Sequence, residues 1–206
     1  MSSDTYYTIA SPGYAEFKEK GSRFIGRAMF AENQDTIDTH IHAIRKEHHD
    51  ATHNCYAYRI GLHENEITRY NDDGEPSGTA GKPILQALLS FQVTNVLVIG
   101  TRYFGGTKLG TGGLIRAYSR AANEALQCAH TKECHLLSTV VLTFSYELTN
   151  MTLHTIENFS GIIIDRKYAH EVRITMAVRK SQLEAFVSRI RENTAGKIKI
   201  DFNRPK

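Results

Sequence analysis

Hydrophobic positions follow the helical period in three stretches of the first two thirds of the chain. Isoleucines recur every three or four residues between Asn33 and His48, which predicts a helix there. Pro83 suits the first position of a second helix, where a missing N–H costs no hydrogen bond, and leucines continue its buried face. A third helix is predicted from Leu114 to Leu126, where apolar residues again fall on one side.

Strand patterns fill the spaces between these helices. We expect strands at residues 6–9, 23–30, 54–60, 66–70 and 93–100. Residues 54–60 and 66–70 alternate on either side of a turn and therefore predict a hairpin. Residues 93–100 are apolar almost throughout, which is typical of a strand buried on both faces.

The pattern breaks at residues 129–135, and a second domain follows. Its expected elements are a strand, a helix, two strands, a helix and a strand, at residues 137–146, 151–159, 162–168, 171–178, 182–192 and 197–202. This βαββαβ order is typical of ferredoxin-like domains. We therefore expect an α+β protein with two domains, residues 1–134 and 135–206.

Composition narrows the class of protein. The chain has 206 residues, of which 41% are hydrophobic and 23% charged, so disorder is a poor explanation. A net charge of +3 is too small for a dedicated nucleic-acid packer. Cys55, Cys128 and Cys134 lack the spacing of a disulfide framework. No apolar run suits a signal peptide or a membrane span, so we expect a cytoplasmic protein without a membrane partner.

Two glycine-rich loops, residues 71–83 and 101–113, each lead into a predicted helix. No Asp or Glu occurs between Pro76 and Asn123, although five Lys and Arg residues do. Helix N-termini attract anions, and glycine lets a bulky anion approach the backbone. The sequence therefore predicts one anion surface, with an aromatic side chain, Tyr103 or Phe104, able to stack on a base. The expected phosphate-binding residues are Lys82, Arg102, Tyr103, Gly105, Gly106, Lys108, Gly112, Gly113, Arg116 and Arg120.

Other interpretations of these loops stay open. The glycines can serve turns and close packing while the cations are merely solvated. Gly81-Lys82 is followed by Pro83 where a P-loop needs Ser or Thr, so we expect no bound nucleotide cofactor. Asp72, Asp73 and Glu75 form a carboxylate group suited to acid–base chemistry or to a cation, and equally to a capped turn.

Histidine and cysteine gather in two places, at residues 48–55 and 128–135. Imidazole and thiolate are zinc ligands, but neither group has an established ligand spacing. We therefore expect no metal site and no catalytic residue. Packing is the simpler account of His53 and Cys55, which share one face of a predicted strand.

Three long segments carry a resemblance to a known family. Residues 51–59 (ATHNCYAYR), 71–81 (NDDGEPSGTAG) and 102–110 (RYFGGTKLG) resemble the IMPACT family, and the whole length is similar to its bacterial members. The resemblance implies an N-terminal domain like a small-subunit ribosomal protein and the fourth domain of elongation factor G, with a left-handed βαβ crossover. It also implies a ferredoxin-like C-terminal domain similar to that factor's fifth domain.

The resemblance also bears on function. Eukaryotic relatives are implicated in translational control through a protein partner, using an additional N-terminal interaction domain that we do not expect here. Together with the basic loops, this predicts a non-catalytic regulator of translation that binds RNA or a ribosome-associated surface. Two alternatives remain: an enzyme acting on a phosphorylated small molecule, and a protein-interaction module acting on a translation regulator.

Overall fold

The chain folds into two compact units in the computed structural model, which describes residues 4–202. One unit is formed by residues 7–133, and the other by residues 4–6 with 134–202. The expected boundary between residues 134 and 135 differs from this division, because the start of the chain belongs with the C-terminal unit. The reason is a pairing that the sequence did not reveal: β1 (Thr5–Ser11) and β7 (His130–His135) form a two-stranded sheet.

A five-stranded sheet is the centre of the N-terminal unit. In spatial order its strands are β2 (Gly13–Glu19), β3 (Ser22–Phe30), β6 (Val96–Tyr103), β4 (His53–Ile60) and β5 (Ile67–Asn71). Each strand is antiparallel to its neighbours. The predicted hairpin is β4 and β5, joined through the short helix η1 (His63–Asn65).

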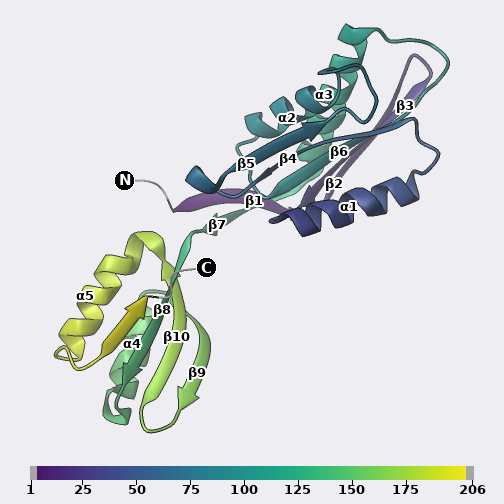
Figure 1. Ribbon diagram of the computed structural model, residues 1–206. Helices are drawn as coiled ribbons and strands as arrows, with labels where there is room; N and C mark the ends of the chain where they lie inside the picture. The colour runs from purple at the N-terminus through teal and green to yellow at the C-terminus, as the bar shows by residue number, and fades with distance from the viewer. Residues whose placement is uncertain (1–3, 203–206) are drawn as a thin grey trace. The chain divides into compact units, whose positions relative to one another are not determined.

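Three helices cover this sheet (Figure 1). Helices α2 (Gly81–Ser90) and α3 (Thr111–Cys128) lie on one face, and α1 (Gln34–Glu47) lies on the other. Strand β6 is buried on both faces, since Val96 and Val98 pack with the α2 and α3 side and Leu97 and Ile99 with the α1 side. This double burial explains its continuous apolar run.

Several boundaries differ from the expected ones. Asn33 caps α1, with its Oδ1 accepting from the Thr36 N–H at 2.9 Å. Helix α2 begins at Gly81, so Pro83 is its third residue and not its first. Strand β6 continues to Tyr103, whereas an end at Gly100 was expected. Strand β2 was not predicted at all.

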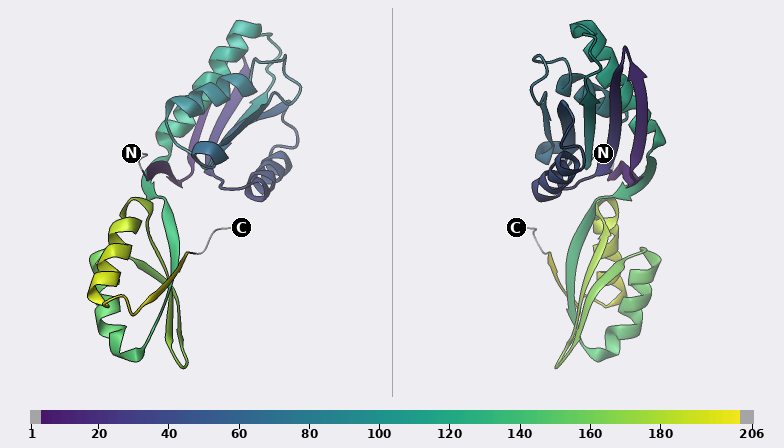
Figure 2. Two further views of the ribbon diagram at one scale, coloured as in Figure 1. Left: turned by 60° about the vertical axis from the view of Figure 1, so that its left-hand side comes forward. Right: turned by 90° about the vertical axis from the view of Figure 1, so that its right-hand side faces the viewer.

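The C-terminal unit consists of a four-stranded antiparallel sheet with two helices on one face (Figure 2). Its elements are β8 (Leu137–Phe144), η2 (Tyr146–Leu148), α4 (Thr149–Asn158), β9 (Ile162–Tyr168), β10 (Val172–Arg179), η3 (Lys180–Gln182), α5 (Leu183–Asn193) and β11 (Lys199–Phe202). The spatial strand order is β11-β8-β10-β9. Every predicted helix and strand of this unit is present, with ends within two residues of those expected.

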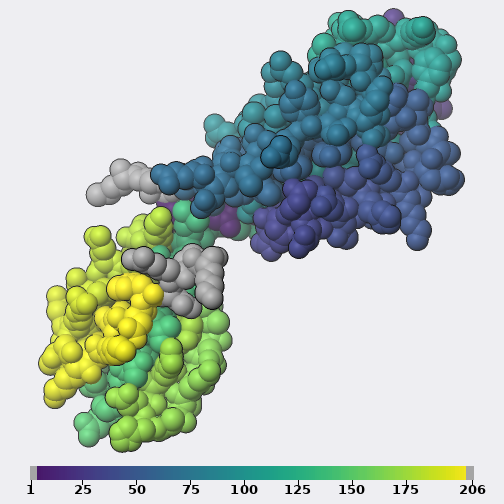
Figure 3. Space-filling view, viewed as in Figure 1, coloured from purple at the N-terminus to yellow at the C-terminus, as the bar shows by residue number. Residues whose placement is uncertain are grey.

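Strand β5 forms one edge of the sheet in the N-terminal unit. All five residues of β5 are exposed, and the blue atoms of the β4–β5 region lie at the surface beside the indigo atoms of α1 in Figure 3. Between residues 4 and 202, none of the helices combines the length and apolar character that crossing a membrane demands.

Candidate anion-binding site

The first glycine-rich loop binds one of its own carboxylates. Asp72 Oδ1 accepts hydrogen bonds from the N–H groups of Ala80 (3.0 Å) and Gly81 (2.8 Å), and its Oδ2 accepts from Gly78 N–H at 2.9 Å. The start of α2 is therefore already occupied by an internal anion. This loop does not offer a free site to a phosphate.

Asp73 is also engaged with the protein. Its Oδ2 accepts from the backbone N–H of Asn54 at 2.7 Å, and its Oδ1 accepts from Arg45 at 2.6 Å. The acid–base role considered for Asp72 and Asp73 loses its support, because both carboxylates are held by backbone N–H groups.

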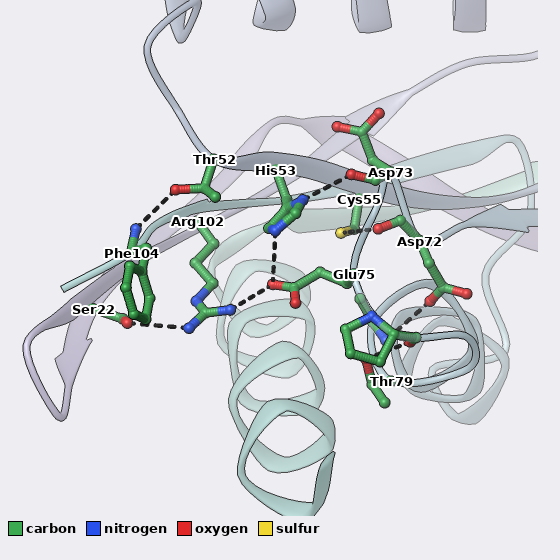
Figure 4. Close-up of polar contacts among 12 residues, drawn as sticks. Ser22, Thr52, His53, Cys55, Asp72, Asp73, Glu75, Thr79, Arg102 and Phe104 are labelled. Atoms are coloured by element: carbon green, nitrogen blue, oxygen red, sulfur yellow. Dashed lines mark hydrogen bonds and ion pairs between the residues drawn. The ribbon is translucent and has the colours of Figure 1, made fainter. Parts of the chain in front are cut away.

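Glu75 and Arg102 form a buried ion pair between the two loops (Figure 4). Arg102 Nη1 donates to Glu75 Oε1 at 2.8 Å, and the Tyr118 hydroxyl donates to the same oxygen at 2.8 Å. The residues Arg102 and Glu75 are only 5% and 7% exposed. Arg102 lies on β6 opposite His53 and Phe24, so its side chain points under α3 and not into solvent. The prediction that Arg102 contacts phosphate is wrong.

His53 and Cys55 belong to the same buried region. His53 Nδ1 lies 2.8 Å from the Asp73 carbonyl oxygen, and Cys55 Sγ donates to the Asp72 carbonyl at 2.9 Å. Burial raises the pKa of the Cys55 thiol well above its usual value and so disfavours the nucleophilic thiolate. In the part of the chain that the structure describes, no group of three or more His, Cys, Asp or Glu side chains is placed to hold a metal ion.

The fold itself explains why two positions of the second loop are glycine. A Cβ on Gly105 would lie 1.9 Å from the carbonyl carbon of Gly21, so only glycine fits against the β2–β3 turn. Gly106 has φ of +84°, a conformation that side chains rarely adopt. Neither glycine needs an anion to explain it.

Neither close packing nor a positive φ explains the glycine at position 112. It lies in the first turn of α3 outside the left-handed region, and a Cβ there would have no neighbour closer than Arg116 Nη1, at 3.6 Å. The start of α3 has no side-chain cap and no acidic residue in its first turn. The first turn of α3 is thus free of a capping carboxylate of its own and lies within contact distance of a guanidinium group.

A recess of about 200 Å³ lies along this part of α3. We call it the α3 recess, and it is lined by Phe17, Glu19, Lys20, Leu109, Gly113, Arg116, Ala117 and Arg120. Three of the lining residues are cations and one is an acid. Arg120 also donates to Glu124 at 2.7 Å, and its guanidinium carbon lies 4.1 Å from the Phe17 ring centroid. The recess is therefore positive, walled on one side by an aromatic ring.

The structure brings together part of the predicted set. Gly113, Arg116 and Arg120 line the α3 recess. Lys82 and Lys108 are exposed but do not line it. Tyr103 lies on β6, where its hydroxyl donates to Asp50 at 3.2 Å, and burial is the main cause of its raised pKa.

Lys20 is a lining residue that the sequence analysis missed. It belongs to the two-residue turn between β2 and β3 and has φ of +47°. The turn signal at Gly21 was visible, and Ala15 and Phe17 alternate with polar residues, which is a strand pattern. Recognising β2 would have placed Lys20 at the tip of a hairpin.

Family models match both units of the chain. The Impact N-terminal domain matches residues 20–126, and a Domain of unknown function (DUF1949) matches residues 142–197. The first match covers both glycine-rich loops and most of the residues that line the α3 recess. The second lies within the C-terminal unit.

Bacterial relatives match over nearly the whole length of the chain. IMPACT family member YvyE of Bacillus subtilis is 34% identical over 95% of this chain and 90% of its own. IMPACT family member YigZ of Escherichia coli is 30% identical over 96% of this chain and 97% of its own. A Dictyostelium discoideum Protein IMPACT homolog is 32% identical over 62% of this chain and 36% of its own. A crystal structure of a hypothetical protein superposes with a TM-score of 0.74 at 28% identity, covering 98% of this chain and 99% of its own.

Proposed function

The chain belongs to the IMPACT family, and from this we propose that it is a non-catalytic, cytoplasmic regulator of translation that binds RNA or a ribosome-associated surface through the α3 recess. The resemblance implies that eukaryotic relatives act in translational control, and this supports a role in translation. The α3 recess supports the proposal that the ligand is RNA, because cations near a helix N-terminus are groups that bind phosphate in proteins.

Gly112 is the observation that carries this proposal. A residue with ordinary φ, whose added Cβ would make only an ordinary van der Waals contact, has no steric need to be glycine. An added Cβ would lie 3.6 Å from Arg116 Nη1, in the first turn of α3 and beside Gly113, which lines the recess while Gly112 itself does not. Glycine-rich helix starts that bind phosphate keep their backbone accessible for this reason.

The size and chemistry of the α3 recess favour binding over catalysis. A volume of about 200 Å³ is below the usual range for small-molecule sites, so it suits one phosphate group of a larger polymer. Among residues 4–202, Glu19 is the one carboxylate that lines it, and Asp72 and Asp73 are held elsewhere by backbone N–H groups. The enzyme alternative therefore has less support than binding.

The finer fold assignment belongs to the same proposal. We propose that the C-terminal unit is ferredoxin-like, which its strand order β11-β8-β10-β9 supports. The βαβ unit β3-α1-β4 is where a left-handed crossover is proposed. Strands β3 and β4 both run antiparallel to β6, and are therefore parallel to each other.

Affinity for a structured RNA as a function of salt tests the proposed function. Phosphate contacts give a linear loss of log affinity with log salt, with a slope of about 0.9 per contact. Replacing Lys20 and Arg116 together by Ala should weaken binding and flatten this slope. The matched control is Lys46→Ala with Arg69→Ala, which removes two exposed cations from α1 and β5.

Three outcomes are informative. A flattened slope in the recess variant alone supports the proposal. Absence of binding by the wild type at low salt removes it. A protein partner recovered from cells after nuclease treatment, without RNA affinity, would support the protein-interaction alternative.

A further inference from the structure

Phe104 is an exposed aromatic residue at the start of the second glycine-rich loop. It is 47% exposed, although it follows the buried strand β6 directly. Its backbone N–H donates to Thr52 Oγ1 at 2.9 Å, and the next N–H, of Gly105, donates to Ser22 Oγ at 3.2 Å. The backbone at Phe104 is therefore held on both sides, and Figure 4 shows the bond to Thr52.

The inner side of the Phe104 ring rests on a buried cation. The guanidinium carbon of Arg102 lies 5.4 Å from the Phe104 ring centroid and 5.6 Å from that of Phe24. Arg102 is itself held by the buried Glu75. Since Arg102 covers one side of the ring, the exposed surface of Phe104 faces away from it, and it is available for stacking.

Tyr103 is not equivalent to Phe104. The guanidinium carbon of Arg23 lies 5.4 Å from its ring centroid, and the His48 ring contacts it edge-on at 6.0 Å between centroids. Its hydroxyl lies between His48 and Asp50. The prediction that either aromatic residue can stack on a base is thus narrowed to Phe104.

The β2–β3 turn connects Phe104 with the α3 recess. Gly21 of this turn contacts Gly105, the neighbour of Phe104, while Lys20 of the same turn lines the recess. A second connection is aromatic: Phe17 of the recess stacks on Phe24 with a centroid distance of 5.5 Å, and Phe24 lies against Arg102. A base and a phosphate of one strand can therefore be bound by adjoining segments.

From this arrangement we propose that Phe104 is a stacking platform for one nucleobase of single-stranded RNA whose phosphate enters the α3 recess. The inference rests on the proposed function and specifies its ligand. A base inside a duplex is already stacked on both faces, so an aromatic platform of this kind selects unpaired nucleotides. A ring fixed before binding loses little conformational entropy when the base arrives.

Phe104→Trp supplies a direct reporter, because the chain contains no tryptophan. The probes are a single-stranded RNA decamer of mixed sequence and an abasic decamer with the same number of phosphates. The decamer should quench the tryptophan emission of this variant, and the abasic strand should not. Quenching by both strands, or by neither while the decamer is bound, would overturn the inference.

Affinity gives the second measurement. Phe104→Leu should weaken decamer binding about 5- to 150-fold, the usual effect of losing one stacked base, and should leave abasic binding unchanged. Tyr70→Leu is the matched control, since Tyr70 is equally exposed, at 47%, on β5 of the same unit. If Phe104→Leu binds the decamer like the wild type while the Lys20 and Arg116 variant does not, the platform is refuted and the proposed function stands. If the wild type binds neither the decamer nor the structured RNA at low salt, both fall.

Discussion

Arg102 and Glu75 are ion-paired at 2.8 Å beneath α3, with side chains 6% and 3% exposed. Removing one partner of a buried pair leaves the other charge without compensation, which typically costs about 3 to 5 kcal/mol. Arg102→Met should therefore destabilise the protein by about that amount in urea unfolding. Adding Glu75→Gln to Arg102→Met should cost less than the two single changes summed.

The control for this prediction is Arg120→Met. Arg120 pairs with Glu124 on the exposed side of α3, with side chains 51% and 36% exposed. Such pairs contribute about 0 to 1 kcal/mol. Equal losses for Arg102→Met and Arg120→Met would contradict a structural role for the buried pair.

Asp72 should stabilise the fold as the cap of α2. Its carboxylate accepts three backbone N–H groups of the loop and helix start, so Asp72→Ala should cost about 1 to 2 kcal/mol. Asp72→Asn keeps an acceptor oxygen and should cost less. Asp38→Ala, which removes an exposed contact with Gln34 on α1, should change the free energy of unfolding by less than either. Urea unfolding of the three variants measures this order.

The thiols of Cys55 and Cys128 should differ in reactivity. Cys55 is completely buried, and burial raises the pKa of its thiol, whereas Cys128 is exposed. A thiol reagent at neutral pH should therefore label Cys128 in the native protein and Cys55 only after unfolding. Mass spectrometry of the labelled peptides gives the assignment. Rapid native labelling of Cys55 would mean that the region beneath α3 opens readily.

The sequence predicted what depends on near neighbours. Helix α1 follows from its isoleucine spacing and from Asn33, whose cap bond is made three residues along the chain. The elements of the C-terminal unit follow from equally local patterns. Strand β2 was missed because its apolar face consists of only Ala15 and Phe17 between polar residues.

The site was predicted less completely, because its charges are neutralised by residues distant in the sequence. Arg102 lies in a stretch without carboxylates, but its partner Glu75 comes 27 residues earlier. Lys20 lies even farther from the second loop, and it joins the α3 recess only because β2 and β3 form a hairpin. Charge counting along the chain detects neither relationship.

His48 should make stability fall as the pH decreases. Burial, as the largest cause, lowers the pKa of His48 below its ordinary value of about 6.5, against the opposing effect of Glu47. Its Nε2 lies 3.3 Å from Arg27 Nη2, which can only donate, so the neutral ring fits this contact. The unfolded chain binds the proton more readily than the folded one.

The stabilisation from a neutral His48 is therefore complete above about pH 6.5 and is lost as the pH falls through that value toward the folded pKa. Urea unfolding between pH 7.5 and 5 measures the loss, and His48→Gln should reduce it. An NMR titration of the His48 ring should give a pKa below 6.5. A value above 6.5 would mean that Glu47 outweighs burial.

Gly105 and Gly112 should respond in opposite ways to the same substitution. Gly105→Ala forces a Cβ to within 1.9 Å of the Gly21 backbone, which cannot move without breaking the β2–β3 turn. The variant should be destabilised by several kcal/mol, or fail to fold. Gly112→Ala meets no atom closer than 3.6 Å, and alanine favours a helix over glycine by up to about 1 kcal/mol. This variant should be as stable as the wild type, or slightly more stable.

RNA affinity separates the two roles of glycine in this loop. If Gly112 keeps the start of α3 open for a phosphate, Gly112→Ala should weaken RNA binding although it does not destabilise the fold. Loss of binding without loss of stability cannot come from unfolding, so it assigns the glycine to the ligand. Unchanged affinity in a stable Gly112→Ala variant would show that the first-turn N–H groups are not used, and the proposed function would lose the observation that carries it.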